Sequence, residues 1–466
     1  MKHRPSPKAV KSARAVAVAP WPWIPCRVHS YRSNDAAMTP EHDPYAGLRH
    51  PLVRIYAAGR SAAVLGVQIT SVAVGWDLYE RTHQAWALGL VGAIELAPVL
   101  AFMFIAGNAA DRYPRRNIMM AAHTVLALSG LGLILAARWN AGVLAIYGCL
   151  LLVGLARAFS APAGGTILPQ LVPAAELANA NAWLSSSYEL AAISGPAVGG
   201  LLIAVSGSAT WAYAVGALGQ VAFVVALSRL PSLRPPPPTE HHDSRELFAG
   251  IAFIRKQPVY LAAITLDLFA VLLGGAVALL PIFAKDILHA GPVGLGLLRA
   301  SPALGALLMA LVATRLRPWE KPGRVLLLVV VGFGLATLGF GLSRVLWLSL
   351  LCLFLTGVFD AVSVVIRLTL EQMITPDALR GRVSAINFVF IGFSNELGAF
   401  ESGATAALIG PVASVVLGGL GAVVVTGLVA LRWPELARIG PLHTLRPADA
   451  RRAEAAAVAT AGETGP

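Results

Sequence analysis

The stretch Gly107-Asn108-Ala109-Ala110-Asp111-Arg112-Tyr113-Pro114-Arg115-Arg116 is a dense polar segment between two apolar runs, at about 85–106 and 118–137. Each run is long enough to cross a hydrocarbon core of about 30 Å, because a helix rises about 1.5 Å per residue. A short basic turn between two membrane spans stays on the cytoplasmic side by the positive-inside rule. The stretch therefore predicts a cytoplasmic loop between two transmembrane helices.

The composition is that of a membrane protein. Of the 466 residues, 56% are hydrophobic and 13% are charged, and the mean hydropathy is +0.69, whereas a soluble domain carries about 25% charged residues. The net charge of +12 comes from basic residues spread over short loops and tails, which fits membrane orientation better than binding to nucleic acid. The three cysteines lie far apart without a C-x-x-C pair, so neither a disulfide framework nor a metal site is expected.

Twelve apolar segments follow one another along the chain. They lie at about 54–78, 86–106, 118–137, 142–164, 182–205, 209–229, 259–284, 294–314, 324–342, 346–368, 384–408 and 411–432. With both ends inside the cell, the cytoplasmic loops hold fourteen Lys and Arg residues, and the opposite side holds four, or five with Arg299. This asymmetry predicts that both termini are cytoplasmic.

We expect five parts in the chain. They are a disordered cytoplasmic tail (1–53, with Met38 as an alternative start), a six-helix bundle (54–229), a cytoplasmic linker around a proline run (230–258), a second six-helix bundle (259–432) and a cytoplasmic tail (433–466). A shift of 203 residues lays one half on the other, with Gly154 on Gly357 and Pro173 on Pro376. Two parallel halves of a transporter would give such a repeat.

The loop pattern carries a family resemblance. Gly107, Asp111, Arg112, Arg115 and Arg116 stand in a spacing that resembles the signature loop between helices 2 and 3 of the major facilitator superfamily. One position departs, because this chain has proline at 114 where the family usually has glycine. In that family the loop acts as a conformational latch. The alternative interpretation is a basic stop-transfer turn.

Helix 5 carries a second motif, Ser194-Gly195-Pro196-Ala197-Val198-Gly199-Gly200. Glycine permits close helix contact and proline bends a helix, so tight packing is expected whatever the function. Gly195, Pro196, Gly199 and Gly200 also resemble the helix 5 motif of the superfamily's drug:proton antiporters, although Ala191 stands where that motif has an upstream glycine. This resemblance favours export.

Four acidic residues inside the expected spans are candidates for proton coupling: Glu95, Glu189, Asp267 and Glu396. An ionisable group there costs about 2.5–3.5 kcal/mol on insertion scales, so each is a functional candidate. A carboxylate in a low-dielectric site binds a proton more tightly, which proton coupling requires. The alternative for each is a carboxyl group hydrogen-bonded between helices or facing a wet cavity.

Two arginines, Arg157 and Arg367, lie towards the cytoplasmic side of helices 4 and 10. Snorkelling of the side chain to the interface is the expectation for Arg367. For Arg157 the functional alternative is an interhelical ion pair, with Asp111 or Glu189 as its partner. Arg157 also resembles the helix 4 arginine of many proton-coupled members of the superfamily, although its neighbours differ from that motif.

The most specific stretch is 357–403, which contains Thr375-Pro376-Asp377-Ala378-Leu379-Arg380-Gly381-Arg382 and Ser394-Asn395-Glu396-Leu397-Gly398. With Pro173-Ala174-Ala175-Glu176-Leu177-Ala178-Asn179-Ala180-Asn181, it resembles the enterobactin-exporter-like branch of the superfamily. The resemblance implies an exporter of small molecules that depends on the proton-motive force. It also implies that Asp111 meets the N-terminus of helix 11 in the outward-open state, near Gly381 and Arg382, where the helix dipole would favour the carboxylate.

The sequence thus predicts an all-α membrane protein of twelve transmembrane helices, in two six-helix bundles around a central cavity. The resemblance implies substrate contacts on helices 1, 4, 7 and 10. The candidates for the cavity wall are Gln68, Trp76, Arg157, Phe269 and Asp360. We expect a monomeric secondary transporter in the inner membrane, with a small molecule and protons as partners and without cofactor or metal. No Walker A loop, HExxH or Ser/His/Asp arrangement suggests an enzyme. Proton-coupled import and a non-transporting membrane sensor remain as alternatives.

Overall fold

The computed structural model describes residues 43–165, 167–232 and 244–442. Within these ranges the regular structure is helical without strands, and twelve helices are long and apolar enough to cross a membrane. The expected all-α class and twelve spans are therefore confirmed. The spans are α2 (Pro51–Thr82), α3 (Ala85–Arg112), α4 (Arg115–Arg138), α5 (Val143–Gly164), α6 (Leu177–Ser206), α7 (Thr210–Ser228), a composite span that begins with α9 (Pro258–Leu273), α11 (Gly291–Ala313), α12 (Pro322–Leu342), α13 (Leu346–Ile374), α14 (Asp377–Ile409) and α15 (Pro411–Arg432).

The polar stretch 107–116 is mostly helical. Helix α3 runs to Arg112 and α4 begins at Arg115, so only Tyr113 and Pro114 connect them. Both helices are longer than the hydrocarbon core requires, and their polar ends can project beyond it. The expected loop is thus a two-residue turn, with Pro114 at the N-cap of α4, where its missing N–H has no helical role.

Three short helices lie in the ranges expected to be tails or linker: α1 (Ala46–Arg49), α8 (Ser244–Lys256) and α16 (Pro434–Ala437). Helix α8 packs against α9 and α14, with Ile254 buried. Apolar residues at 247, 248, 251 and 254 recur at helical spacing, which explains why this part of the linker is a helix. The proline run at 235–238 and the terminal ranges 1–42 and 443–466 lie outside the described residues.

The seventh span is broken. It continues from α9 through a 3₁₀ turn (Ala276–Leu279) and α10 (Leu280–Ile282) into a π-helical turn (Phe283–Ile287). The break falls at Gly274 and Gly275, where a Cβ on Gly275 would lie 2.5 Å from Ser402 Oγ and 2.6 Å from the carbonyl oxygen of Gly398. The backbone therefore approaches α14 more closely than any residue with a side chain would allow.

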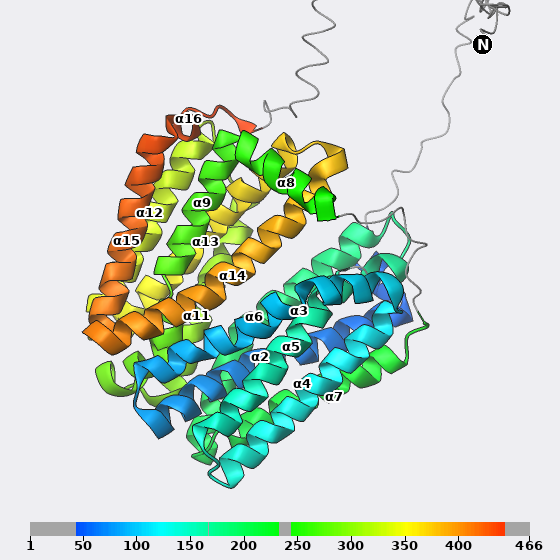
Figure 1. Ribbon diagram of the computed structural model, residues 1–466, viewed down its shortest axis with the longest axis vertical. Helices are drawn as coiled ribbons and strands as arrows, with labels where there is room; N and C mark the ends of the chain where they lie inside the picture. Colours follow the sequence, from blue (N-terminus) through cyan, green and yellow to red (C-terminus); the bar gives the residue numbers. More distant parts are fainter. Residues whose placement is uncertain (1–42, 166, 233–243, 443–466) are drawn as a thin grey trace, which may run out of the picture. The chain divides into compact units, whose positions relative to one another are not determined.

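The spans form two bundles, α2–α7 and α9–α15 (Figure 1). In the first, α2 packs on α6 and α7, α4 packs on α5 and α7, and α3 packs on α5; in the second, α9 packs on α14 and α15, α12 on α13 and α15, and α11 on α13. The order of helix pairs is the same in both bundles. The residue-by-residue repeat at a shift of 203 stays a prediction.

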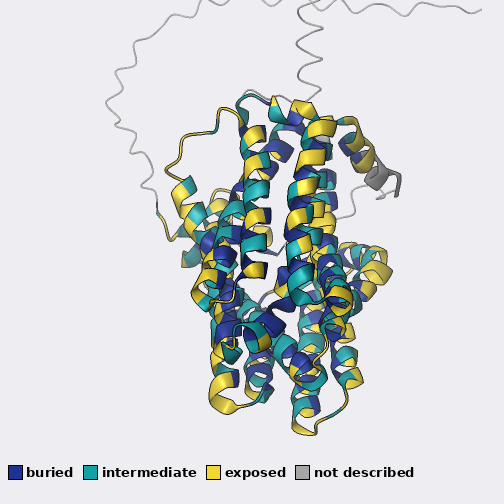
Figure 2. Cartoon of the chain, turned by 90° about the vertical axis from the view of Figure 1, so that its left-hand side faces the viewer, coloured by how far each residue is buried: buried dark blue, intermediate teal, exposed yellow. Residues whose placement is uncertain are grey.

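The outer faces of the bundles are rich in exposed residues (Figure 2), and many of these are large and apolar. Leu144, Val205, Leu408 and Leu431 are each more than 80% exposed. In water such a surface would favour aggregation. It suits a lipid environment, where apolar side chains need no protein cover.

The two bundles meet through α3 with α14 and α6 with α11. A Cβ on Gly403 of α14 would lie 2.3 Å from the Cα of Gly89 on α3, and one on Gly200 of α6 would lie 2.3 Å from the carbonyl oxygen of Pro292. Small residues thus let the backbones of the two halves touch, as in other tightly packed membrane helices.

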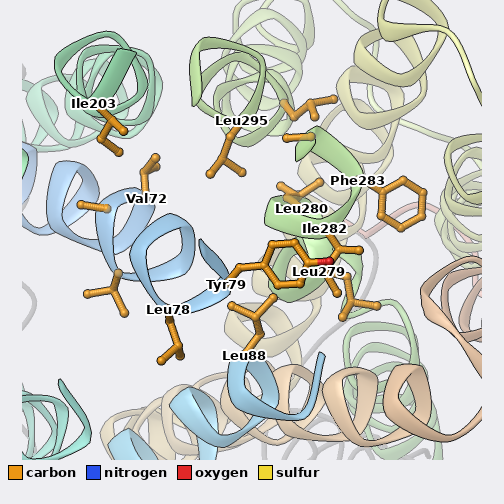
Figure 3. Close-up of a cluster of buried hydrophobic side chains, with 14 of the residues drawn as sticks. Val72, Leu78, Tyr79, Leu88, Ile203, Leu279, Leu280, Ile282, Phe283 and Leu295 are labelled. Carbon is orange, nitrogen blue, oxygen red and sulfur yellow. The ribbon is translucent and has the colours of Figure 1, made fainter. Parts of the chain in front are cut away.

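One end of the molecule is sealed by a buried apolar cluster drawn from both halves. Figure 3 shows its members, including Tyr79 from α2, Ile203 from α6, Phe283 from the broken span and Leu295 from α11. We call this the closed end. The opposite end carries the exposed side chain of Arg112. We call it the basic end, because it is the side of the loops in which most of the Lys and Arg residues stand.

Candidate functional site

A cavity of about 930 Å³ lies between the two bundles. Its wall includes Gln68 of α2, Glu95 of α3 and Arg157 of α5 from the first bundle, and Asp360 of α13 and Glu396 of α14 from the second. The volume is in the range of sites that enclose drug-sized ligands.

An ion-pair network crosses the cavity. The Nη1 atom of Arg157 donates to Glu95 Oε2 at 2.6 Å and to Glu396 Oε1 at 2.8 Å. The arginine side chain is about half exposed to the cavity, while the two carboxylates are mostly covered. Arg157 therefore links α3 and α5 of one half to α14 of the other. The expected pairing of Arg157 with Asp111 or Glu189 is wrong, because its guanidinium contacts Glu95 of α3 and Glu396 of α14 instead.

A second arginine, Arg299 of α11, completes this cluster. Its Nη2 atom donates to Ser71 Oγ at 2.6 Å, and its charge acts on both Glu95 and Glu396. Two cations thus balance two carboxylates at the contact between the halves. The sequence suggests Arg299 only as a possible fifth basic residue on the side opposite the cytoplasmic loops, just inside its span, although a charge inside a span was the signal that could have placed it here.

A separate network lies in the second bundle. Arg367 of α13 forms an ion pair with Asp267 of α9, and its Nη2 atom is 3.9 Å from Asp360 Oδ1. The Arg367 and Asp267 side chains are about 9% and 11% exposed, whereas Asp360 is half exposed and lines the central cavity. The snorkelling expected for Arg367 is wrong, because a buried carboxylate holds the guanidinium inside the bundle.

Glu371, which sequence reasoning missed, forms a polar cluster near the basic end. The buried carboxylate accepts hydrogen bonds from Tyr260 Oη at 2.8 Å, from Asn387 Nδ2 at 2.9 Å and from Ser384 Oγ. It thereby ties the first turns of α14 to α9 and α13. The signal in the sequence was an acid near the end of an apolar run, which also fits an ordinary interfacial residue.

His123 of α4 was also missed. Its Nδ1 atom lies 2.8 Å from Gln220 Oε1 on α7, and Gln220 Nε2 donates to the carbonyl oxygen of Ala63 at 3.0 Å. Both His123 and Gln220 line the central cavity. A lone histidine in an apolar run carries no signal for its partner, which is about a hundred residues away in the chain.

The remaining candidates divide by position. Gln68, Arg157 and Asp360 line the cavity, whereas Trp76 and Phe269 are not among its lining residues. Trp76 lies two helical turns beyond Gln68, against Lys285 at the closed end. Phe269 is exposed, because it stands two residues and about 200° around α9 from the inward-facing Asp267. Glu189 of α6 is half-buried and outside the cavity wall.

The two family motifs have clear positions. Asp111 is exposed and has no ion pair with a described residue, while Arg116 Nη1 donates to the carbonyl oxygen of Leu230 at 2.6 Å. The glycines of the motif in the fifth span, which is α6, are contact points. A Cβ on Gly195 would lie 2.5 Å from Gln68 Cβ, and Gly200 touches α11. Tight packing accounts for these glycines. A latch or antiport role stays a prediction.

The closed end adds polar contacts between the halves. Tyr79 Oη donates to Asp286, and Lys285 Nζ donates to Glu80 Oε2 at 2.6 Å. Both partners on the second half belong to the π-helical turn of the broken span. Apolar packing and paired charges therefore seal the same end.

A family model described as Major Facilitator Superfamily matches residues 57–399, and the chain belongs to that superfamily. It is a secondary transporter and not an enzyme, a multi-pass inner-membrane protein with a small-molecule substrate.

Among individual proteins, the chain is 31% identical over 394 residues to proteins named Enterobactin exporter EntS from Citrobacter koseri and Escherichia coli O1:K1, covering 84% of this chain and 93% of each relative. The fold is similar to that of a bacterial homologue of the human lysosomal transporter Spinster, inward-facing and unoccupied (TM-score 0.63, 13% identity, 83% of this chain and 98% of that one). It is also similar to that of a POT family transporter in complex with 5-aminolevulinic acid (TM-score 0.66, 10% identity, 82% and 96%).

Proposed function

We propose that the protein is a proton-coupled exporter of a small, siderophore-like or drug-like molecule, working by alternating access. The observation that carries this proposal is the contact of Arg157 with Glu95 and Glu396, which come from opposite halves. An arginine shared by two carboxylates across the moving interface couples charge to conformation.

The proposed coupling arises because Glu95 and Glu396 compete for the guanidinium of Arg157. While both carboxylates are ionised, Arg157 holds Glu396 and so helps to keep the halves together. A proton on Glu396 weakens that bridge, whereas a proton on Glu95 removes the competing carboxylate and strengthens it. Proton binding and release at Glu95 and Glu396 would then bias the two halves toward separation or closure.

The conformation fits loading from the cytoplasm. Contacts between the halves, including Tyr79 with Asp286 and Glu80 with Lys285, gather at the closed end. The basic end would be cytoplasmic by the positive-inside rule, with both termini on that side. In this inward-open state the latch formed by Asp111 would be disengaged, and it would meet the start of α14 only when the cavity opens outward.

Export, rather than import, is supported by two observations. The relatives at 31% identity are named as exporters of enterobactin, and the helix 5 motif resembles that of antiporters. The motif lies where α6 contacts both α2 and α11, so it can influence how the halves move against each other.

The test uses inside-out vesicles that contain the protein, an acidified lumen and a pH-sensitive dye. Enterobactin, cationic dyes and antibiotics are added in turn, with vesicles lacking the protein as the control. Release of protons from the lumen that depends on cargo and on the protein would support antiport. Cargo accumulation in right-side-out vesicles, driven by external acid, would instead establish an importer.

A further inference from the structure

His123 is the only histidine within the membrane spans of the described residues. It lines the central cavity from α4, and its ring packs edge-on against Phe223, with the ring centroids 4.6 Å apart. An ionisable ring inside a span is rare unless it has a partner or a role. The coupling network of Arg157 does not use it.

The hydrogen bonds around Gln220 fix the protonation of this ring. The carbonyl oxygen of Ala63 can only accept, so the Gln220 side-chain nitrogen must face it. The Gln220 side-chain oxygen then faces His123 Nδ1 at 2.8 Å, and that oxygen can only accept. His123 Nδ1 therefore carries the hydrogen, and in the neutral ring Nε2 carries the lone pair.

The Nε2 atom of His123 is left as an acceptor without a protein partner. No described residue forms a hydrogen bond with it, and the ring belongs to the cavity wall. Since Nδ1 is occupied by Gln220, Nε2 is the only ring atom that can bond to a molecule in the cavity.

The surroundings decide which donor suits this atom. A lone pair repels an anion, and the positive charge of Arg60 acts on His123, which disfavours a cationic donor. A neutral O–H group satisfies both conditions. An aromatic hydroxyl is a stronger neutral donor than an aliphatic one, and the ring of Tyr188, which lines the same cavity, offers a face on which an aromatic cargo can pack.

We propose that His123 is a cargo-recognition residue whose Nε2 atom accepts a hydrogen bond from a neutral, preferably aromatic, hydroxyl group of the transported molecule. Gln220 is a positioning residue that holds the ring in the accepting tautomer. The proposal rests on the proposed function, because it names a chemical feature of the cargo in the same cavity.

The experiment measures binding of two probes to the purified full-length protein by isothermal titration calorimetry. The probes are enterobactin and enterobactin whose hydroxyl groups are all methylated. One hydrogen bond contributes about 0.5–1.5 kcal/mol, so the wild-type protein should prefer the hydroxyl form by about 2- to 12-fold in Kd. His123→Phe keeps the ring volume without an acceptor, and should bind both probes within about twofold of each other.

Two further variants separate recognition from general damage. Thr124→Val is the matched control on α4, because Thr124 is exposed and bonds only to its own helix; its preference should equal that of the wild type. If His123→Phe does not fold, Gln220→Leu carries the test, and its preference should fall because the tautomer is no longer fixed.

The outcomes are distinct. A preference for the hydroxyl probe that is unchanged in His123→Phe, or in Gln220→Leu where that variant carries the test, overturns the proposal. Equal binding of both probes by the wild type, or binding of neither, also overturns it. Proton release with another cargo in the vesicle assay would then show that the transport function stands while this assignment fails.

Discussion

Arg157 and Glu396 are 239 positions apart in the chain, yet Nη1 of the arginine lies 2.8 Å from Oε1 of the glutamate. This ion pair joins the two halves beside the cavity. Because the same nitrogen also contacts Glu95, the arginine is shared between a carboxylate of its own half and one of the other.

Neutralising Glu396 should uncouple transport. Glu396→Gln keeps the shape of the side chain but removes the charge that Arg157 holds. Losing one partner of a close charge pair costs about 2 kcal/mol or more, so we expect cargo-driven proton release to fall at least about tenfold. Glu320→Gln, in an exposed loop, is the matched control and should leave proton release unchanged. Full proton release by Glu396→Gln would remove the support for coupling through this residue.

Locking the closed end should stop the cycle. In a protein whose native cysteines are replaced by alanine, Glu80→Cys and Lys285→Cys can be joined by a short linker that forms a disulfide with each thiol, because the native side chains meet at 2.6 Å. Cargo transport in vesicles should drop to background and return after reduction. The same linker on either single-cysteine variant serves as the control. Transport at the normal rate in the linked protein would mean that this end need not open.

The buried pair of Asp267 and Arg367 should show strong non-additivity. Asp267→Asn leaves Arg367 without its main partner, and removing one member of a buried pair destabilises a protein by about 3 kcal/mol. Asp267→Asn combined with Arg367→Met removes both charges and should recover most of that loss. Thermal unfolding in detergent measures both variants. An equal melting temperature of Asp267→Asn and the wild type would show that the ion pair does not contribute to stability.

The glycine contact between α3 and α14 should tolerate no side chain. In Gly403→Ala the added Cβ would lie 2.3 Å from the Cα of Gly89, and such overpacking costs about 1–3 kcal/mol. We expect a lower melting temperature and weaker linker formation between positions 80 and 285. Gly427→Ala is the control, since nothing lies within 4 Å of its added Cβ. A melting temperature equal to that of the control would contradict the close contact.

The latch role of Asp111 can be separated from cargo binding. Asp111→Asn should leave the Kd for cargo unchanged, because the residue is exposed and far along α3 from Glu95. The transport rate should fall several-fold, since the outward-open state would lose a favourable contact of about 0.3–1 kcal/mol with the N-terminus of α14. Asn108→Ala, in the same polar stretch, is the comparison. A normal turnover rate in Asp111→Asn would argue against the latch.

The fold could be predicted from the sequence because the bilayer imposes a simple rule. Runs of about twenty apolar residues must be helices, and basic turns set their direction. The break at Gly274 and the π-helical turn after it were not predicted, although Gly274, Gly275 and Pro281 interrupt the apolar run and Lys285 and Asp286 stand at its end.

The site was only partly predictable. Glu95, Asp267 and Glu396 could be identified one by one, because a charge in a span is conspicuous. Their partners could not, because a guanidinium reaches several ångströms and its choice depends on which helices lie side by side. Arg157 pairs with Glu396 of the other half, and the ion pair with Asp267 keeps Arg367 inside the second bundle.

The connection of α3 to α4 by Tyr113 and Pro114 alone has a mechanical consequence. Tyr113 and Pro114 leave almost no slack, so the start of α4 must follow when the end of α3 moves. A small tilt of α3 at Glu95 would therefore displace this turn at the basic end. The polar stretch 107–116 would then move together with the Glu95 carboxylate, which lies on the same helix. A longer turn between α3 and α4 would remove the coupling between the two helices.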